Sequence, residues 1–490
     1  MSSNVIEKNQ QRKDAFKTTL NPIKSCRKRQ ESAFLIRKNK MQTKLNKRRQ
    51  IAPTKLSTCD LSQMPAKLRQ LQSSAWQDCL HATRYFRQLL AVAEHPPIDE
   101  VIASGGLAKF VEFLSYDQYP ILQFEAAWTL TNISSGTKTH TNAVVSTGIL
   151  PTLIRLLKSP CEEVKEQCVW CLGNIAGNSL AHRDLVIAGG AVSFLLAIML
   201  PTAKRSLLQN ATWLLTNICR GKPRPSITLS WEISKKFQEL LAIQDNAILN
   251  DALWGLHYLA DGPNERIQKI IDTGVVPELI RLLSHPVISV QTPALRTLGD
   301  IVSGNDMQTQ IVVDHAIPQL WKILNSPSIS LRKETCWVLS NIAAGNIFQI
   351  QTLIEQNIFE PLQVMLRTQP YPIQKEIIWT LSNTCKGGSE KQIQHLYKLG
   401  FLAPVIQLMT IEDTNLVSLL VEIANSMLGV CGHACREQFE QLDGPHVIEE
   451  LQQSKDEEVY EAAVRFIEEH LEQEDEEVRE DFTDCSAMLF

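Results

Sequence analysis

Five times along the chain, a Trp is followed four residues later by an Asn. The pairs are Trp128/Asn132, Trp170/Asn174, Trp213/Asn217, Trp337/Asn341 and Trp379/Asn383. When Trp254 and Arg296 fill the gap, successive positions step by 42, 43, 41, 42, 41 and 42 residues. A spacing of four residues puts Trp and Asn on one helix face, about one turn apart. The pattern therefore predicts a series of equivalent helices, each presenting one such pair.

A fixed period of roughly 40–47 residues is typical of helical repeats of the armadillo and HEAT type. Each such repeat buries its apolar side only against its neighbours, so the repeats stack into a solenoid. We expect an all-α, right-handed armadillo-repeat solenoid of about ten repeats, at about 42 residues each. The outer repeats lack the pair, with Phe86/Leu90 at one end and Val421/Asn425 at the other. Terminal repeats that cap a stack are commonly atypical in this way.

Within most repeats, a turn followed by a short apolar helix precedes the helix that carries the pair. This element opens at Gly106, Gly148, Gly190, Gly274, His315, Asn357 and Phe401. Gly allows positive φ at such a turn, and Pro near the start of the next helix is tolerated because its missing N–H would be unpaired there. We therefore expect a helix break at each of these positions.

Charge divides the chain into three parts. Residues 1–55 contain 16 Lys or Arg and 3 Asp or Glu, a net charge of +13; since the whole chain carries −4, the remainder carries −17. We expect a basic arm over residues 1–65 that is disordered alone, a solenoid over residues 66–467, and an acidic, mobile tail over residues 468–490. A basic arm on an acidic body can reach nucleic acid, an acidic partner or its own body.

The sequence shows neither a secretory signal nor a membrane span. Its N-terminus has no apolar h-region, and we find no run of 18 apolar residues. The 12 Cys are scattered through the chain, as expected of free thiols in a reducing compartment. We expect a protein of the cytoplasm or nucleus that does not insert into membranes.

The Trp–Asn face suits an extended cationic peptide. Asn offers a donor and an acceptor, which can hold a peptide backbone without reading its sequence. Parallel indoles form slots for the alkyl stem of Lys or Arg, worth ~0.5–2 kcal/mol each. Acidic groups beyond the rings would receive the charged heads. The candidates are Asp251, Glu334 and Glu376, each three residues before a Trp, although a solvated helix residue is an equally good reading of any one of them.

The ladder of pairs is interrupted in its middle. The repeats at Trp254/Tyr258 and Arg296/Asp300 lack the Asn, and Arg296 takes the place of Trp. This predicts two sites, a larger one with three pairs over residues 128–217 and a smaller one with two pairs over residues 337–383. Arg296 puts a cation between them, so a ligand with two basic clusters would occupy both sites and loop over the middle.

Six motifs in order resemble the importin α (karyopherin α) family. They are EAAWTLTNISSGT (125–137), EQCVWCLGNIAG (166–177), NATWLLTNICRGKP (210–223), ALRTLGDIVSG (294–304), KETCWVLSNIAAGN (333–346) and KEIIWTLSNTCKGG (375–388). The resemblance covers nearly the whole chain. It implies an adaptor without enzymatic activity or cofactor that binds basic nuclear localisation signals and links them to importin β for passage through the nuclear pore. It also implies shuttling between cytoplasm and nucleus.

The resemblance also implies which residues form the two sites. The larger site would comprise Trp128, Asn132, Gly136, Thr141, Gln167, Trp170, Asn174, Asn178, Asn210, Trp213, Asn217 and Asp251. The smaller site would comprise Arg296, Gly304, Thr309, Glu334, Trp337, Asn341, Glu376, Trp379 and Asn383.

In the arm, the resemblance implies two functions. The cluster Lys47, Arg48 and Arg49 would mimic a localisation signal and occupy the larger site in cis. A second set would bind importin β: Arg27, Lys28, Arg29, Arg37 and Lys38. The C-terminal repeat with its acidic helix resembles the region contacted by the recycling exportin, which acts with Ran-GTP.

The chain departs from the family pattern at three places. Asn178 stands where members carry an Asp, the carboxylate for the key Lys of the signal. In the smaller site Asp300 replaces an Asn, and the arm lacks the usual dense run of Arg. We expect these changes to alter signal affinity and the set of cargoes, so a specialised paralogue without a general import role is an alternative.

Other functional classes are less consistent with the residues. We find no phosphate loop, nucleophile elbow or zinc helix, and Cys168 and Cys171 fit core thiols better than a redox or metal pair. Cys431, His433 and Cys435 are likewise expected to be core or turn residues. A catenin-like scaffold would need a basic groove for acidic ligands. Nucleic-acid binding by the arm would show as salt-dependent binding of residues 1–55 alone, and we do not expect it.

Overall fold

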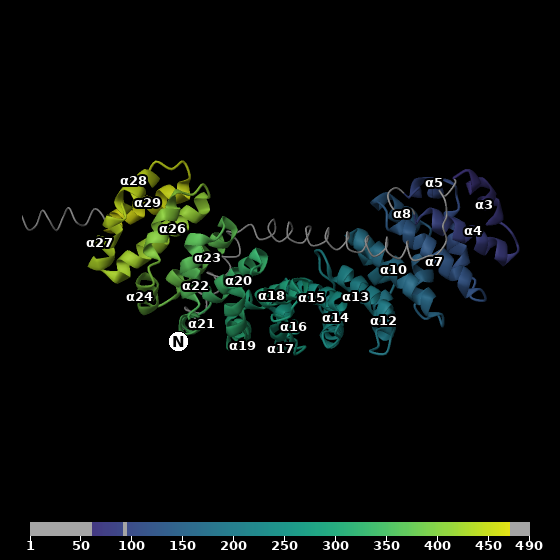
Figure 1. Cartoon of the computed structure of the whole chain (residues 1–490), viewed down its shortest axis with the longest axis horizontal. Coiled ribbons are helices and arrows are strands. Elements are labelled where there is room, and N and C mark those ends of the chain that lie inside the picture. The colour runs from purple at the N-terminus through teal and green to yellow at the C-terminus, as the bar shows by residue number, and fades with distance from the viewer. Residues whose placement is uncertain (1–60, 92–95, 471–490) are drawn as a thin grey trace, which may run out of the picture. The chain divides into compact units, whose positions relative to one another are not determined.

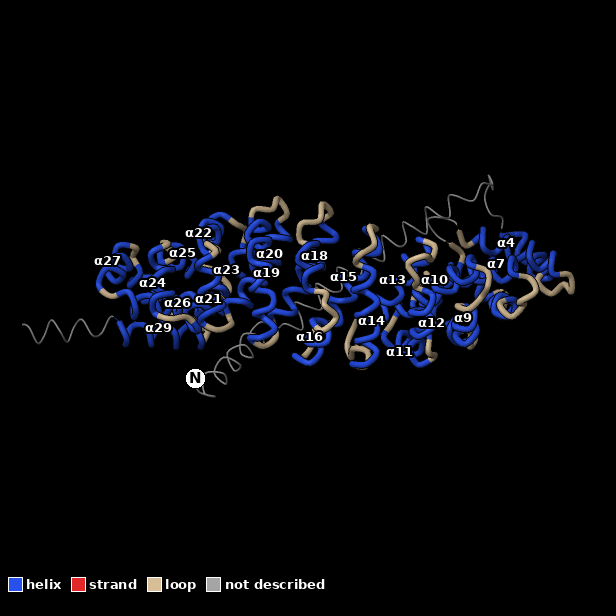
Figure 2. Tube along the Cα trace, turned by 90° about the horizontal axis from the view of Figure 1, so that it is seen from below, coloured by secondary structure: helices blue, strands red, loops and turns tan. Residues whose placement is uncertain are grey.

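The computed structural model describes residues 61–91 and 96–470, which form helices and connecting turns without a strand (Figure 2). They divide into an N-terminal unit that ends at Asp261 and a C-terminal unit that begins at Gly262. The two units are coloured purple to teal and teal to yellow in Figure 1. The fold is all-α, as predicted.

After a 3-10 turn at Leu61–Gln63, the described residues of the N-terminal unit form thirteen helices. They are α3 (Met64–Gln70), α4 (Trp76–Leu89), α5 (Ile98–Ala103), α6 (Leu107–Phe113), α7 (Pro120–Ser134), α8 (Lys138–Ser146), α9 (Leu150–Leu156), α10 (Glu162–Asn178), α11 (Leu180–Ala188), α12 (Ala191–Ile198), α13 (Arg205–Cys219), α14 (Ile227–Leu240) and α15 (Asn246–Ala260). The long helices α7, α10, α13 and α15 each end one repeat, and we call them third helices, together with α4 of the first repeat.

The C-terminal unit has the same organisation. Its helices are α16 (Asn264–Ile271), α17 (Val276–Leu282), α18 (Ile288–Val302), α19 (Asp306–Leu324), α20 (Ile329–Ala343), α21 (Ile347–Glu355), α22 (Phe359–Thr368), α23 (Tyr371–Gly387), α24 (Glu390–Lys398), α25 (Leu402–Gln407), α26 (Thr414–Cys431), α27 (His433–Gln441), α28 (Gly444–Leu451) and α29 (Glu457–His470), with a 3-10 turn at Leu408–Thr410. Its third helices are α18, α20, α23, α26 and α29.

Left-handed residues separate the first and second helices of most repeats. Gly148, Gly190 and Gly274 have φ values of 73°, 77° and 74°, and Asn357 has a φ of 52°. Asn tolerates this conformation better than other residues with a side chain. The turns predicted at these four positions are therefore confirmed. In two other repeats the left-handed residue is Gly105 or Gly400, one position before the predicted start.

The break predicted at His315 is wrong. Helix α19 runs without interruption from Asp306 to Leu324 and carries Pro318 in its interior. His315 and Ala316 stand where the other repeats have Gly or Asn, so no residue there favours left-handed backbone, and the helical conformation continues. Helix α14 likewise replaces two short helices with one.

Within each unit, successive third helices pack against one another. In the N-terminal unit α4, α7, α10, α13 and α15 pack in sequence, and in the C-terminal unit α18, α20, α23, α26 and α29 do so. These helices contribute most of the core, including Leu130, Leu172, Leu214 and Leu339, which are fully buried. Stacking of equivalent helices brings residues one period apart to the same height in neighbouring helices.

Buried glutamines connect the first helices of the C-terminal unit. Gln349 Nε2 donates to Asp306 O at 2.8 Å and to Gln310 Oε1 at 3.1 Å, while Gln349 Oε1 accepts from its own N-cap, Asn346 N, at 3.2 Å. Gln308 and Gln392 make the same three contacts in their repeats. One side chain thus caps its own helix and bonds to the previous one.

Helix α26 is long and apolar enough to cross a membrane by length and composition, and so is the bent pair α11 and α12 if it is counted as one segment. Such tests are also passed by core helices. Helix α26 packs between α23 and α29 and against α24 and α25, in the position of a third helix. We therefore assign it to the core of its repeat.

The hydrogen bonds of the three buried glutamines, which we call the glutamine ladder, predict a specific loss of stability when one glutamine is removed. Gln349→Ala removes three part-buried hydrogen bonds made by a fully buried residue, so we expect the free energy of unfolding to fall by about 2–3 kcal/mol. Urea unfolding of the full chain measures this. Gln356→Ala, at an exposed position on the end of the same helix, should change it by less than about 0.5 kcal/mol. Equal effects of the two changes would contradict the ladder.

Candidate functional site

The third helices carry the Trp–Asn pairs at a common height. Trp128, Trp170 and Trp213 lie on α7, α10 and α13, which are consecutive third helices of the N-terminal unit. Trp337 and Trp379 lie on α20 and α23 of the C-terminal unit. The structure therefore brings together the members of each predicted ladder within its own unit.

Glycines make room for two of the indoles. A Cβ atom on Gly173 would lie 2.1 Å from Cζ3 of Trp213, and one on Gly299 would lie 2.0 Å from Cζ3 of Trp337. Each Gly lies on the preceding third helix, directly before the residue that occupies the Asn position of that helix. Trp213 and Trp337 are half-buried, whereas Trp170 and Trp379 are 2% and 6% exposed. The rings are thus packed in defined positions against the helices around them.

The asparagines bond neighbouring helices together. Nδ2 of Asn174, Asn217 and Asn383 donates to Thr131 O, Gly173 O and Ser340 O at 3.1, 3.1 and 3.0 Å. Each acceptor precedes the ladder Asn of the previous repeat. These Asn side chains therefore contribute to packing between repeats as well as to the predicted peptide-binding face. Asn174 Nδ2 also donates to Ser134 Oγ at 3.4 Å, whereas Asn341 Nδ2 is buried without a hydrogen-bond partner. The carbonyl oxygens of Asn174, Asn217 and Asn383 take no part in these bonds.

The first pair is held by an arginine of the preceding repeat. Asn132 Nδ2 donates to Arg87 O at 3.4 Å, and its Oδ1 is buried without a partner. The Arg87 guanidinium carbon lies 4.4 Å from the centroid of the Trp128 ring. Its Nε bonds to Glu125 Oε2 at 2.5 Å, and Glu125 Oε1 also meets Arg84 Nε at 3.1 Å. Glu125 lies three residues before Trp128, the register in which we had singled out other carboxylates.

Sequence reasoning missed both Arg87 and Glu125. Arg87 lies one residue after the position that corresponds to the Trp of the other repeats. Its ion-pair partner, Glu125, lies 38 positions further along the chain. The one available signal was that Glu125 shares its place relative to Trp with Glu334 and Glu376.

The predicted acidic groups are not solvated helix residues. Glu334 is 3% exposed and bonds through Oε1 to Arg296 Nη2 at 2.7 Å, and Glu376 is 5% exposed. Asp251 is half-buried and accepts a hydrogen bond from Asn250 Nδ2 at 2.9 Å. In the larger site, Gln167 and Asn210 occupy the same register; Asn210 donates to Glu166 Oε1 at 3.4 Å. The side chains three residues before each Trp of the third helices thus form a row that is polar and buried or half-buried.

Four further candidates stabilise turns between repeats. Thr141 Oγ1 donates to Ser134 O and Thr137 O at 3.1 and 3.2 Å, and Thr309 Oγ1 donates to Val302 O at 3.1 Å. A Cβ on Gly136 would meet His140, and one on Gly304 would meet Gln308. The hydroxyls of both Thr are thus directed into the repeat and bond backbone carbonyls there.

Two of the three departures from the family pattern, Asn178 and Asp300, lie in the described residues and are positioned differently. Asn178 is the last residue of α10, half-buried, with Oδ1 buried and without a partner. Arg220 Nη2 donates to the carbonyl of its neighbour Gly177 at 2.7 Å. Asp300 is 8% exposed on α18. A cationic group of the protein itself thus reaches the backbone beside the position where the family carries Asp.

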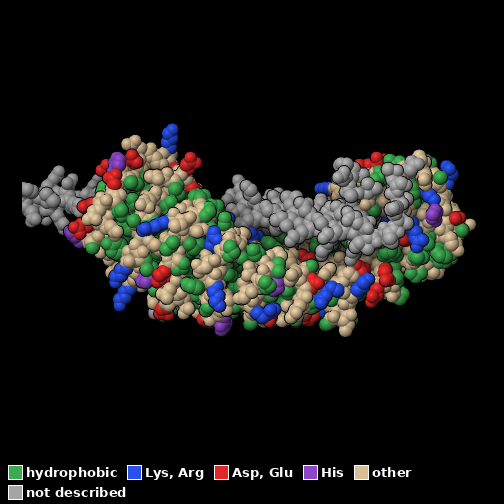
Figure 3. Space-filling model, viewed as in Figure 1, with side chains coloured by type: hydrophobic (Ala, Val, Ile, Leu, Met, Phe, Trp, Pro, Cys, Tyr) green, Lys and Arg blue, Asp and Glu red, His purple; other side chains and the backbone are tan. Residues whose placement is uncertain are grey.

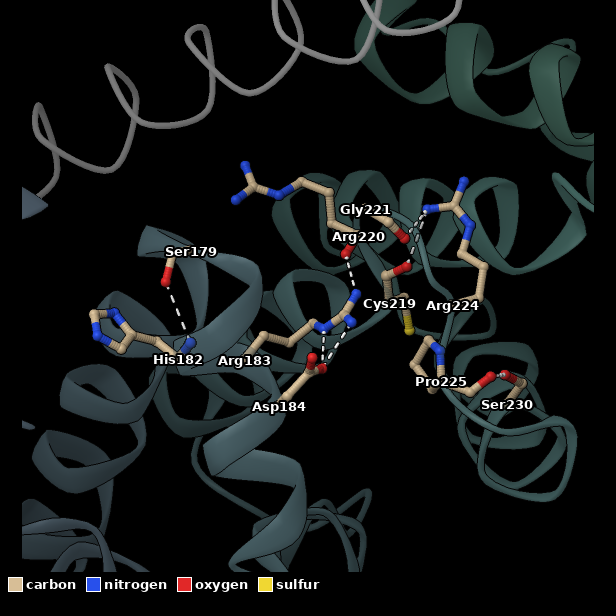
Figure 4. A network of polar contacts seen from close by, with 10 residues as sticks. All are labelled: Ser179, His182, Arg183, Asp184, Cys219, Arg220, Gly221, Arg224, Pro225 and Ser230. Carbon is tan, nitrogen blue, oxygen red and sulfur yellow. Dashed lines mark hydrogen bonds and ion pairs between the residues drawn. The ribbon is translucent and has the colours of Figure 1, made fainter. Parts of the chain in front are cut away.

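Arginines also anchor the loop around Arg220 (Figure 4). Arg183 Nη1 donates to Arg220 O at 2.8 Å, while its other nitrogens bond to Asp184. Arg224 donates to Cys219 O and Gly221 O and forms an ion pair with Asp261 at 2.6 Å. The Pro-rich segment after α13 is therefore fixed onto its own repeat.

Cys168, Cys171 and Cys435 are buried in the core, whereas Cys431 is half-buried. Cys168 and Cys171 are fully buried, and burial raises the pKa of Cys171 to about 12 and that of Cys168 well above its usual value. Burial also raises the pKa of Cys435 to about 12, while His433 is 89% exposed on its side chain. Within residues 61–91 and 96–470, no group of three or more His, Cys, Asp or Glu could hold a metal ion.

Charge is mixed on the face of the described residues that Figure 3 shows. On the face seen in Figure 3, acidic and basic side chains alternate with hydrophobic ones and do not gather into one patch. The arm residues Lys47, Arg48, Arg49, Arg27, Lys28, Arg29, Arg37 and Lys38 lie outside the described residues, as does the tail beyond His470.

Comparison with known proteins agrees with this repeat architecture. The Armadillo/beta-catenin-like repeat pattern matches residues 94–135, 139–177, 263–303 and 305–344, and an atypical Arm repeat matches residues 436–484. The crystal structure of an engineered protein superposes with a TM-score of 0.75 at 25% sequence identity, covering 83% of this chain and 98% of that one. The armadillo solenoid fold is thereby confirmed.

Three similar curated proteins are importin α subunits. Importin subunit alpha-3 of Arabidopsis thaliana is 38% identical over an alignment of 503 positions, gaps included, that covers 97% of this chain and 95% of that protein. Importin subunit alpha-1b of Oryza sativa subsp. japonica is 40% identical over 430 residues, 85% and 80% of the two chains. Importin subunit alpha-B of Dictyostelium discoideum is 46% identical over 308 residues, 61% and 60% of the two chains. With this similarity over nearly its whole length, the chain belongs to the importin α family.

Proposed function

We propose that this chain is a non-enzymatic adaptor that binds basic nuclear localisation signals in its Trp–Asn ladders and links them to importin β. A role in nuclear import follows from its family. The signals, the link to importin β, return by an exportin with Ran-GTP, and shuttling between cytoplasm and nucleus are the finer parts of the proposal.

The observation that supports signal binding is the stacking of equivalent Trp–Asn pairs on consecutive third helices. Helices α7, α10 and α13 carry three pairs, and α20 and α23 carry two. The bonds of Asn174, Asn217 and Asn383 to the preceding helix fix these three amides and still leave their carbonyl oxygens for an extended backbone. Buried carboxylates lie three residues before Trp128, Trp337 and Trp379, and the first two of them are paired with Arg87 and Arg296.

The two ladders should differ in what they bind. In protein lacking residues 1–60, which keeps α3, we expect Trp170→Ala with Asn174→Ala to weaken a monopartite basic peptide by about 2–4 kcal/mol, because one slot and one or two hydrogen bonds are lost. Trp379→Ala with Asn383→Ala should affect mainly bipartite peptides. The two pairs are matched controls, since Asn174 and Asn383 make the same inter-helix bond at 3.1 and 3.0 Å. Equal losses in calorimetry with a monopartite peptide would contradict the division.

The arm should inhibit binding in cis. A tethered basic segment has an effective concentration near millimolar, so even weak pairing competes with cargo. Deleting residues 1–60, or changing Lys47, Arg48 and Arg49 to Ala in the full chain, should increase the affinity for a basic peptide when importin β is absent. Fluorescence anisotropy measures the affinity. If neither change alters it, the arm does not occupy the larger site.

Asn178 should make the larger site a weaker receptor for a lysine. Its amide can accept a hydrogen bond from an ammonium but cannot neutralise it, and charge-assisted bonds are about twice as strong. We expect Asn178→Asp to tighten a Lys-containing signal roughly tenfold, or about 1–2 kcal/mol, in protein lacking residues 1–60. Because Asn178 ends α10, a carboxylate there also opposes the helix dipole and should lower stability slightly.

A peptide with that lysine replaced by norleucine is the control for Asn178→Asp. It should bind both proteins equally, because it has no charge for the carboxylate to meet. Affinities within twofold for the lysine peptide at moderate salt would show that position 178 does not read the lysine.

A further inference from the structure

The outermost indole of the larger ladder already holds a cation of the protein itself. Helix α4 has Phe86 and Leu90 in the ladder register, yet its Arg87 extends over Trp128 of α7. The guanidinium carbon is 4.4 Å from the ring centroid, and the Arg87 and Glu125 side chains are 9% and 7% exposed. The contact is therefore a buried one.

This contact uses the chemistry that the ladder offers to a ligand. A cation lies over an indole face, and its charge is met by a carboxylate three residues before that Trp. In the same unit the row continues with Gln167 before Trp170 and Asn210 before Trp213, which are neutral. Glu125 is thus the one carboxylate of this row among the three pairs of the larger ladder, and Arg87 holds it.

The smaller ladder starts in a related way. Arg296 of α18 bonds to Glu334, which lies three residues before Trp337, the first Trp of that ladder. In both units, then, an arginine of the preceding third helix is paired with the carboxylate behind the first Trp. The recurrence at two places in the chain argues against a chance surface pair.

We propose that Arg87 is an end stop that sets the register of a peptide in the larger site. This rests on the proposed function. Because Arg87 covers the outer face of Trp128 and neutralises Glu125, a basic side chain of the ligand can enter the ladder only from the Trp170 side. The number of basic ligand residues that can be bound is therefore limited to the number of slots between the indoles. One more basic residue beyond Trp128 does not increase the affinity of the ligand.

Displacement of Arg87 by a ligand is unfavourable. Its Nε bond to Glu125 is charge-assisted, and leaving a buried carboxylate without its partner is costly. Arg84 also meets Glu125, at 3.1 Å, but it is 42% exposed and does not lie over the indole. The two arginines share one carboxylate and differ in whether they cover the ring, which makes Arg84 a matched control.

The test uses Arg87→Met and Arg84→Met in protein lacking residues 1–60. Three peptides are titrated: a monopartite basic peptide, and the same peptide with one additional Arg at its N-terminal or its C-terminal end. With Met at position 87, we expect one extended peptide to bind about five- to tenfold more tightly than the parent, because a new slot with a carboxylate has opened. The unchanged protein and Arg84→Met should bind parent and extended peptides within twofold.

Two further variants identify the cause. Arg87→Lys keeps a cation and should retain the behaviour of the unchanged protein, and Arg87→Met with Glu125→Gln should lose the gain because the carboxylate is absent. If Met at position 87 lowers the melting temperature below that of the assay, Arg87→Gln, which keeps a hydrogen-bond donor for Glu125, replaces it with the same expected results.

The outcomes separate this inference from the proposed function. If the unchanged protein binds the parent peptide but a folded Arg87 variant gains nothing from either extension, the end stop is wrong and signal binding stands. A gain of the same size in Arg84→Met would also overturn it, since charge alone would then explain the effect. If the unchanged protein binds no basic peptide, the proposed function itself fails.

Discussion

The packing of each third helix on the one before it determines the rest of this structure. It buries the core leucines, brings residues one period apart to equal height, and places the Asn amide against a carbonyl of the neighbouring helix. The indoles depend on it as well, since Trp213 fits only where Gly173 presents bare backbone. A peptide-binding row in this fold is therefore also part of the inter-repeat contact.

Because the same residues serve both the predicted peptide binding and the packing between repeats, the sequence alone could predict only part of the structure. The period and the spacing of four predicted the helices, their stacking and the two ladders, because helical geometry translates these spacings directly into faces. The partners of the Asn amides, Thr131, Gly173 and Ser340, lie about one period away, and no local pattern indicates them. The break expected at His315 failed because the apolar pattern continues there while the residue that would turn the chain is missing.

The charged groups were the hardest to predict. Glu334 looked like a solvated helix residue or a contact for a ligand, and the structure instead buries it against Arg296. Arg87 gave no signal at all, because its role depends on a Trp and a Glu of the next repeat. The Trp and Asn positions of the two sites followed from the repeat pattern, whereas the polar environment behind them did not, since burial and pairing arise only when the helices meet.

The glutamine ladder has a consequence for the evolution of such chains. Gln308 bonds to Asn264 O and Gln268 Oε1, and Gln349 bonds to the equivalent groups of the next repeat, Asp306 O and Gln310 Oε1. If one full period between them were excised, Gln349 would meet the partners that Gln308 leaves behind, and no buried donor would be orphaned. Gain or loss of whole repeats by recombination is thus tolerated by this contact, whereas an insertion of a few residues is not. The hydrogen bonds between the repeats are thus preserved when the chain grows or shrinks by whole repeats.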